Sequence, residues 1–140
     1  LDNCSFCAVK QSRGILKSHS VESIKQKFLQ EIPFTKEFWF TSPDTGAFGR
    51  DIKTNLPKML KEILNSTQED FRIRLGMMNP NHCSHFFEEL MQQMQDERLY
   101  NFLHIPVQSG SNTILNSMKR RYSREQFLEL VDKANNLFAK

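Results

Sequence analysis

The feature that most constrains the fold is an alternation of strand-like and helix-like segments. Three short runs, residues 37–41, 71–77 and 102–107, have the aromatic or alternating apolar pattern of buried strands. Each is followed by apolar residues at helical spacing, and another helical pattern over residues 21–32 precedes the first run. Strands that recur roughly every 30 residues with helices between them predict parallel β/α units. We therefore expect an α/β fold with a parallel sheet, either a barrel or an open doubly wound sheet.

Chain length limits how much of such a fold is present. The 140 residues are enough for one core of ordinary size. Three parallel strands cannot close a barrel, the last helix has no strand after it, and a strand is expected before Leu1. We therefore expect residues 1–140 to be one part of a larger β/α domain, truncated at both ends. Residues 8–19 have no clear period and are predicted to be a loop, whereas Ser123 and Gln126 have the spacing of a capping box.

Polar and small residues follow each predicted strand. Because the carboxyl ends of parallel strands share one rim, these loops are expected to meet where sites are built. A carboxylate there can hold an amino group, hydroxyl and amide groups can bind a hydroxyl or a carboxylate, and glycine permits close backbone approach. Turns and helix caps explain each loop equally well. The candidate residues are Ser42, Asp44, Thr45, Gly46, Gln108 and Ser109.

Two cysteines three residues apart, Cys4 and Cys7, form a C-x-x-C pair. A tight turn directs both sulfurs at one metal or cluster, and the pattern is shared by zinc sites, redox dithiols and iron–sulfur sites. The third cysteine, Cys83, lies between His82 and His85, but this spacing matches no compact zinc finger. Three cysteines that cannot all pair favour a reducing, cytoplasmic setting.

Composition excludes several other classes. No apolar run is long enough to span a membrane, and no secretory signal opens the chain. The motifs GxGxxG and GxxxxGK[ST] are missing, which argues against a dinucleotide or nucleoside-triphosphate fold. A net charge of +3 leans mildly toward anionic partners.

The cysteine pair resembles part of a known cluster motif. Cys4-Ser5-Phe6-Cys7 is similar to the second half of C-x-x-x-C-x-aromatic-C in radical S-adenosylmethionine enzymes, whose first cysteine would directly precede Leu1. Arg13-Gly14 and residues 102–111 and 118–122 resemble the methylthiotransferases of that family. Residues 41–51 and 74–80 resemble the archaeal and eukaryotic branch, which modifies N6-threonylcarbamoyladenosine next to the tRNA anticodon.

This resemblance implies a partial radical S-adenosylmethionine barrel and its cofactor chemistry. Three cysteines would hold a [4Fe–4S] cluster whose fourth iron binds the amino and carboxylate groups of S-adenosylmethionine. One electron from the cluster would split the cofactor's C–S bond, and sulfur and a methyl group would then be inserted at C2 of the adenine. The implied partners are a tRNA anticodon stem-loop, an electron donor and a sulfur source.

The resemblance also assigns roles to residues. Cys4 and Cys7 would be cluster ligands, and Phe6 would pack beside the cofactor's adenine. The loop from Ser42 through Asp44 and Thr45 to Gly46 would receive the cofactor's methionine end, and Gln108 with Ser109 its ribose or carboxylate. Arg13 and Arg120 would contact the RNA, although Lys119-Arg120-Arg121 is equally typical of a solvated charged turn.

Such enzymes also have an N-terminal domain with a second cluster and a C-terminal RNA-binding domain, neither of which lies in this sequence. We therefore expect the 140-residue chain alone not to turn over. Two alternatives remain: a methylthiotransferase of the isopentenyladenosine or ribosomal-protein branch, and a non-catalytic β/α piece that binds RNA or zinc.

Overall fold

The computed structural model describes residues 3–138, without the side chains of Lys10 and Leu137. Two strands are formed, β1 (Glu37–Phe40) and β2 (Arg72–Leu75). The longer helices are α2 (Val21–Glu31), α3 (Leu56–Asn65), α5 (Phe87–Gln93) and α7 (Arg124–Phe138). The shorter ones are α1 (Val9–Arg13), α4 (Pro80–Cys83) and α6 (Asn112–Ser117), with 3₁₀ turns η1 (Thr45–Ala47) and η2 (Ser84–Phe86).

The two strands pair in parallel, which confirms the predicted α/β fold with parallel strands. Phe38 lies opposite Ile73, and Phe40 lies opposite Leu75. Helix α3 crosses from the end of β1 back to the start of β2, as parallel pairing requires. The carboxyl ends of both strands therefore lie at the same edge, where their following loops meet.

The prediction of a third strand over residues 102–107 is wrong. The third segment joins β2 earlier, through a single parallel bridge between Leu99 and Ile73. The Phe102 amide then donates to the Tyr100 carbonyl oxygen at 2.7 Å, and this tight turn interrupts the extended backbone. Pro106 has no N–H to offer a ladder. Beyond the bridge, the segment touches the rim where the Met78 amide donates to the His104 carbonyl oxygen at 2.9 Å.

Two further expectations need correction at the ends of elements. Residues 8–19 were expected to be a loop, but Val9–Arg13 form the short helix α1, which ends before Gly14. The loop expected to close β2 continues into α4, whose start is capped by the Asn79 side chain. Pro80 occupies the first turn of α4, where its missing N–H costs little.

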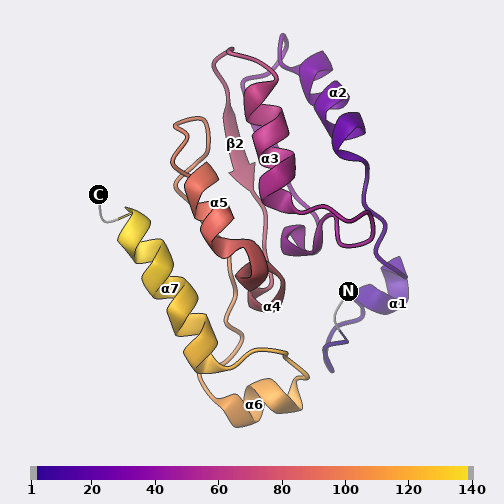
Figure 1. The fold of residues 1–140 in the computed structure, drawn as a ribbon. Helices are drawn as coiled ribbons and strands as arrows, with labels where there is room; N and C mark the ends of the chain where they lie inside the picture. Colours follow the sequence, from indigo (N-terminus) through magenta and orange to yellow (C-terminus); the bar gives the residue numbers. More distant parts are fainter. Residues whose placement is uncertain (1–2, 139–140) are drawn as a thin grey trace.

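One layer of helices covers one face of the sheet. Helices α2, α3, α5 and α7 follow one another side by side in Figure 1. The core between helices and sheet contains an aromatic group in which the Phe28 ring lies 4.5 Å from Phe38 and 5.0 Å from Phe71. Trp39 and Arg74 lie on the opposite face of the sheet. The guanidinium carbon of Arg74 lies 4.9 Å from the Trp39 ring.

Helix caps form where the sequence signals them. Ser123 and Gln126 make both bonds of the predicted capping box, at 2.8 and 3.3 Å. The side chains of Ser20 and Asn55 accept the first free amides of α2 and α3. None of the helices in the part of the chain that the structure describes has both the length and the apolar character needed to cross a membrane.

Candidate functional site

The cysteine loop, residues Asn3–Cys7, forms a backbone turn that contains both thiols of the C-x-x-C pair. The Cys7 amide donates to the Cys4 carbonyl oxygen at 3.3 Å, which closes the turn. Cys4 is half-buried, Cys7 is exposed, and neither is in a disulfide. The Phe6 ring is 54% exposed. The loop thus offers two thiols and an aromatic face to a bound group.

A segment from the other end of the chain, which we term the docking segment (Ser117–Tyr122), holds the cysteine loop. The Ser5 amide donates to the Met118 carbonyl oxygen at 3.1 Å, and the Ser5 hydroxyl donates to that of Ser117 at 3.2 Å. These carbonyls belong to the end of α6, where carbonyls have no partner within the helix. The cysteine loop therefore satisfies the end of a helix more than a hundred residues away.

The end of α6 has the hydrogen bonds of a Schellman motif. The Lys119 amide donates to Asn116 and the Arg120 amide donates to Leu115, both at 2.9 Å. Lys119 takes the left-handed conformation that this motif requires, with φ 58°. The motif turns the chain sharply, and because the Leu115 side chain is fully buried, it fixes the backbone of Arg120.

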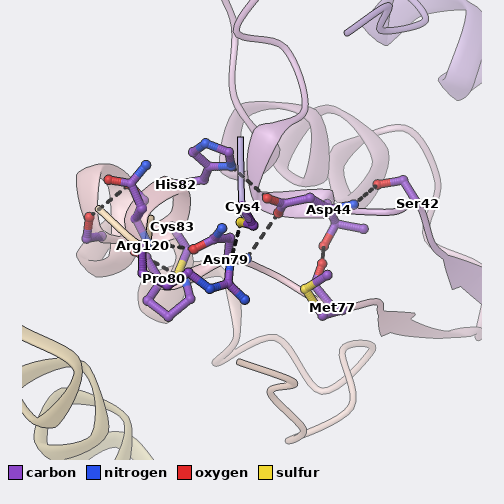
Figure 2. A network of polar contacts seen from close by, with 12 residues as sticks. Cys4, Ser42, Asp44, Met77, Asn79, Pro80, His82, Cys83 and Arg120 are labelled. Atoms are coloured by element: carbon purple, nitrogen blue, oxygen red, sulfur yellow. Dashed lines mark hydrogen bonds and ion pairs between the residues drawn. The ribbon is translucent and has the colours of Figure 1, made fainter. Parts of the chain in front are cut away.

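The side chain of Arg120 contacts the cysteine loop. Its Nη1 donates to the sulfur of Cys4 at 3.4 Å, a contact drawn in Figure 2. Its guanidinium carbon lies 5.5 Å from the Phe6 ring and 6.0 Å from the Tyr122 ring. Its Nε is buried without a hydrogen-bond partner in the described part of the chain.

These residues fit an anionic iron–sulfur cluster. Cysteine thiolates are the ligands such clusters use, and a guanidinium beside one of them balances negative charge. Among the described residues, no three His, Cys, Asp or Glu side chains come together to hold a metal ion. The third ligand predicted directly before Leu1 lies outside the described residues.

The loops that follow β1 and β2 are joined by a buried polar contact. The Asp44 carboxylate lies 2.6 Å from Nδ1 of His82, and these side chains are only 9% and 1% exposed. The other oxygen of Asp44 accepts the Asn79 amide at 3.1 Å. Figure 2 draws the contacts of Asp44 with both partners as dashed lines. We term this set of contacts, from Asp44 to Asn79 and His82, the Asp44 clamp.

The neighbours of Asp44 in its loop are also used internally. The Thr45 hydroxyl is within hydrogen-bonding distance of the Met77 and Gly76 carbonyl oxygens, at 2.8 and 3.1 Å. A Cβ at Gly46 would lie 3.1 Å from an Asp44 oxygen, a tight contact that would make the Asp44 side chain shift by a few tenths of an ångström. Ser42 alone of the four predicted residues in this loop is exposed, and its hydroxyl accepts the Asp44 amide at 3.2 Å.

The third predicted loop has an unusual backbone. Gln108 is exposed and has φ 71°, a conformation that costs a non-glycine residue free energy and that is often retained at binding sites. The Ser109 hydroxyl accepts the Ser111 amide at 3.1 Å. The Tyr122 hydroxyl donates to the Val107 carbonyl oxygen at 2.6 Å, and burial raises the pKa of this hydroxyl. The docking segment thus contacts both the cysteine loop and the loop at Gln108.

A hollow of about 320 Å³ opens at the carboxyl end of β1. Its walls include residues 16–19, which follow α1, and residues 39–42, which run from β1 into the Ser42 loop. Asp44 and Thr45 line the same hollow. The loop that the sequence predicted to bind a cofactor therefore borders a hollow whose other walls are largely apolar.

Two of the residues singled out by sequence have side chains that take no part in the hydrogen bonds of the cysteine loop or the Asp44 clamp described above. Arg13 is exposed at the end of α1. Cys83 is buried in the core, where burial and the nearby Asp44 carboxylate raise the pKa of its thiol to about 12. Such a thiol stays protonated at neutral pH and is a poor metal ligand.

Sequence reasoning missed two residues that organise the site. His82 was considered only as a zinc ligand, because nothing in its spacing reveals a partner 38 positions earlier. Tyr122 was part of a family match, but its contact with Val107 depends on how the docking segment folds back. The Schellman signal that directs this segment was hidden by a lysine at the position where glycine is usual.

Comparison with known proteins defines the class. The description of the Radical SAM superfamily matches residues 2–140, nearly the whole chain. The chain belongs to this superfamily, in agreement with its cysteine loop and its parallel β/α arrangement.

The similar curated proteins carry a more particular name. A probable threonylcarbamoyladenosine tRNA methylthiotransferase of Pyrococcus abyssi is 45% identical over 99% of this chain and 32% of its own length. The corresponding protein of Archaeoglobus fulgidus is 42% identical over 99% of this chain and 33% of its own. The human threonylcarbamoyladenosine tRNA methylthiotransferase is 41% identical over 94% and 23%. The chain therefore spans a third or less of these relatives.

Proposed function

We propose that this chain is part of a tRNA-modifying enzyme that methylthiolates C2 of N6-threonylcarbamoyladenosine next to the anticodon. The observation that carries the proposal is the cysteine loop, held by the docking segment with an arginine at the sulfur of Cys4. The superfamily match supports the cofactor class, and the relatives' names support the substrate. The roles below are inferred for the full-length protein.

The cysteine loop would hold a [4Fe–4S] cluster through Cys4 and Cys7, with a third cysteine from outside the described residues. The cluster, when bound with S-adenosylmethionine, supplies one electron for reductive cleavage of the cofactor's C–S bond. The turn closed by the Cys7 amide keeps the two cysteines close along the backbone. The exposed ring of Phe6 offers a flat apolar surface against which the cofactor's adenine can stack.

The two rim loops would bind the other parts of the cofactor. Ser42 is exposed at the hollow beside β1 and can donate its hydroxyl to the methionine end. Asp44 contributes by holding the shape of this loop, because both its oxygens have partners in the clamp. Gln108 and Ser109, in the loop that precedes α6, would contact the ribose or the carboxylate of the cofactor.

The remaining partners follow from the reaction. The substrate is a tRNA anticodon stem-loop, to which the exposed Arg13 would donate a phosphate contact. A reductant must supply the electron and a sulfur source must supply the inserted atom. The domains that other members use for a second cluster and for RNA binding are expected in the rest of the protein, and the 140-residue chain alone is expected not to turn over.

Nucleoside analysis of tRNA tests the proposal. In a strain that lacks the gene, we expect the 2-methylthio form of N6-threonylcarbamoyladenosine to disappear while the unmethylthiolated nucleoside accumulates. Full-length protein should restore it, and the Cys7→Ala variant should not. Loss of methylthiolated isopentenyladenosine instead would assign the protein to the other tRNA branch, and unchanged tRNA in the deletion strain would contradict a tRNA substrate.

A further inference from the structure

We propose that Arg120 is a positioning residue for the iron–sulfur cluster: by donating to the sulfur of Cys4, it holds the cysteine loop and raises the reduction potential of the cluster. The inference rests on the proposed function, because it requires that Cys4 be a cluster ligand. It gives Arg120 a role different from the RNA contact that the sequence suggested.

Arg120 contacts the sulfur of Cys4 directly. Arg120 Nη1 lies 3.4 Å from the sulfur of Cys4, which is a normal separation for an N–H···S hydrogen bond. The two residues are 116 positions apart, so local chain geometry does not explain the contact. The bonds from Ser5 to Ser117 and Met118 bring the two segments together at the same place.

Arg120 is held in place through both its backbone and its side chain. The Schellman motif at the end of α6 fixes its backbone through the bond to Leu115. Its guanidinium lies near the rings of Phe6 and Tyr122, where cation–π attraction favours the charged group. An arginine that binds RNA phosphate is normally free to follow the backbone, whereas this one is half-buried. Its neighbour Arg121 is exposed and suits that role better.

The positive charge of Arg120 also bears on the reduction potential of the cluster. Hydrogen bonds to ligand sulfurs and nearby positive charge favour the reduced cluster, which carries one more negative charge than the oxidised cluster. The reaction needs a reduced cluster. A group that raises the reduction potential therefore favours the form of the cluster that donates the electron.

The test is the reduction midpoint of the cluster in anaerobically reconstituted full-length protein. Electron paramagnetic resonance spectra are recorded during a potentiometric titration. The signal that changes on addition of S-adenosylmethionine is followed, so that a second cluster is not measured. For Arg120→Gln we expect normal iron and sulfide content and a ratio of reduced to oxidised cluster about tenfold lower at a fixed potential, which corresponds to about 59 mV for one electron. Arg121→Gln is the matched control and should leave the midpoint unchanged.

Arg120→Lys keeps the charge but loses the planar fork, and should lower the ratio less than Arg120→Gln. If Arg120→Gln fails to assemble a cluster, a lowered midpoint in Arg120→Lys supports the inference and a wild-type midpoint there overturns it. A wild-type midpoint in Arg120→Gln, with or without weaker tRNA binding, also overturns it. Absence of a cluster from wild-type protein would instead refute the proposed function.

Discussion

The two halves of the site are built in different ways. The Asp44 clamp joins loops of adjacent β/α units, and its side chains are buried against the core. The cysteine loop is joined by three hydrogen bonds to the docking segment, which lies more than a hundred residues later in the chain. The side chains of Phe6 and Cys7 in this loop are exposed. The contrast indicates that the loops after β1 and β2 are set by the folding of the core, whereas the cysteine loop is set by a few contacts outside it.

This difference predicts that the two halves respond differently to substitution. A change in the buried rim should lower the free energy of unfolding as well as any cofactor binding. A change in the cysteine loop or the docking segment should alter the cluster while leaving the fold nearly intact.

The largest expected effect comes from a matched pair of glycines. Gly49, beside the buried rim, has φ 82°, and an added Cβ would lie 2.6 Å from backbone atoms of Thr54. Gly14, after α1, has φ 71° and nothing within 4 Å of the Cβ position. We expect Gly49→Ala to cost roughly 3 kcal/mol or more and Gly14→Ala about 1 kcal/mol, since only the first adds a clash to the left-handed strain. Urea unfolding measures both, and equal costs would contradict the packing assigned to the rim.

A smaller effect is expected at the Asp44 clamp. Asp44→Ala removes an acceptor of the Asn79 amide and a buried partner of His82, which should cost about 3 kcal/mol or somewhat less. Asp51→Ala is the control, since Asp51 is exposed and accepts the Ser18 amide outside the core. Midpoints of urea unfolding compare the two. A shift for Asp51→Ala as large as that for Asp44→Ala would show that the clamp is not a special contact.

The smallest effect is expected in the docking segment. Lys119 carries left-handed strain at the end of α6, where glycine is preferred. Lys119→Gly should be neutral or stabilise by about 0.5 kcal/mol, because relief of strain of about 1 kcal/mol is partly offset by the greater freedom of glycine in the unfolded chain. A Tm scan compares it with Lys53→Gly, which has the same backbone conformation (φ 57°) beside the buried rim. Strong destabilisation by Lys119→Gly would mean that the lysine side chain itself holds the segment.

Sequence predicted the elements well where periodicity and capping agree. Helices α2, α3 and α7 and both strands lie where the apolar patterns indicated, because burial against one core face sets those patterns. The third strand was missed because the apolar run at residues 102–107 could not reveal the turn at Phe102 or the earlier bridge at Leu99.

The candidate site was predictable in its location and less so in its contacts. The family motif and the rim rule led to the cysteine loop and the loops after the strands. They could not reveal that Thr45 and Gly46 are buried against Met77 and His82, or that Arg120 folds back onto Cys4. Such contacts depend on tertiary packing between distant residues, which a single sequence does not encode in any local spacing.

The central claim is that the cysteine loop holds an iron–sulfur cluster, and iron and sulfide content tests it most directly. Full-length wild-type, Cys4→Ala and Cys83→Ala proteins should be reconstituted anaerobically and compared. We predict that Cys4→Ala loses the cluster perturbed by S-adenosylmethionine, whereas Cys83→Ala, which alters a buried thiol of the core, retains it. Full retention of that cluster in Cys4→Ala, or its loss only in Cys83→Ala, would contradict the account.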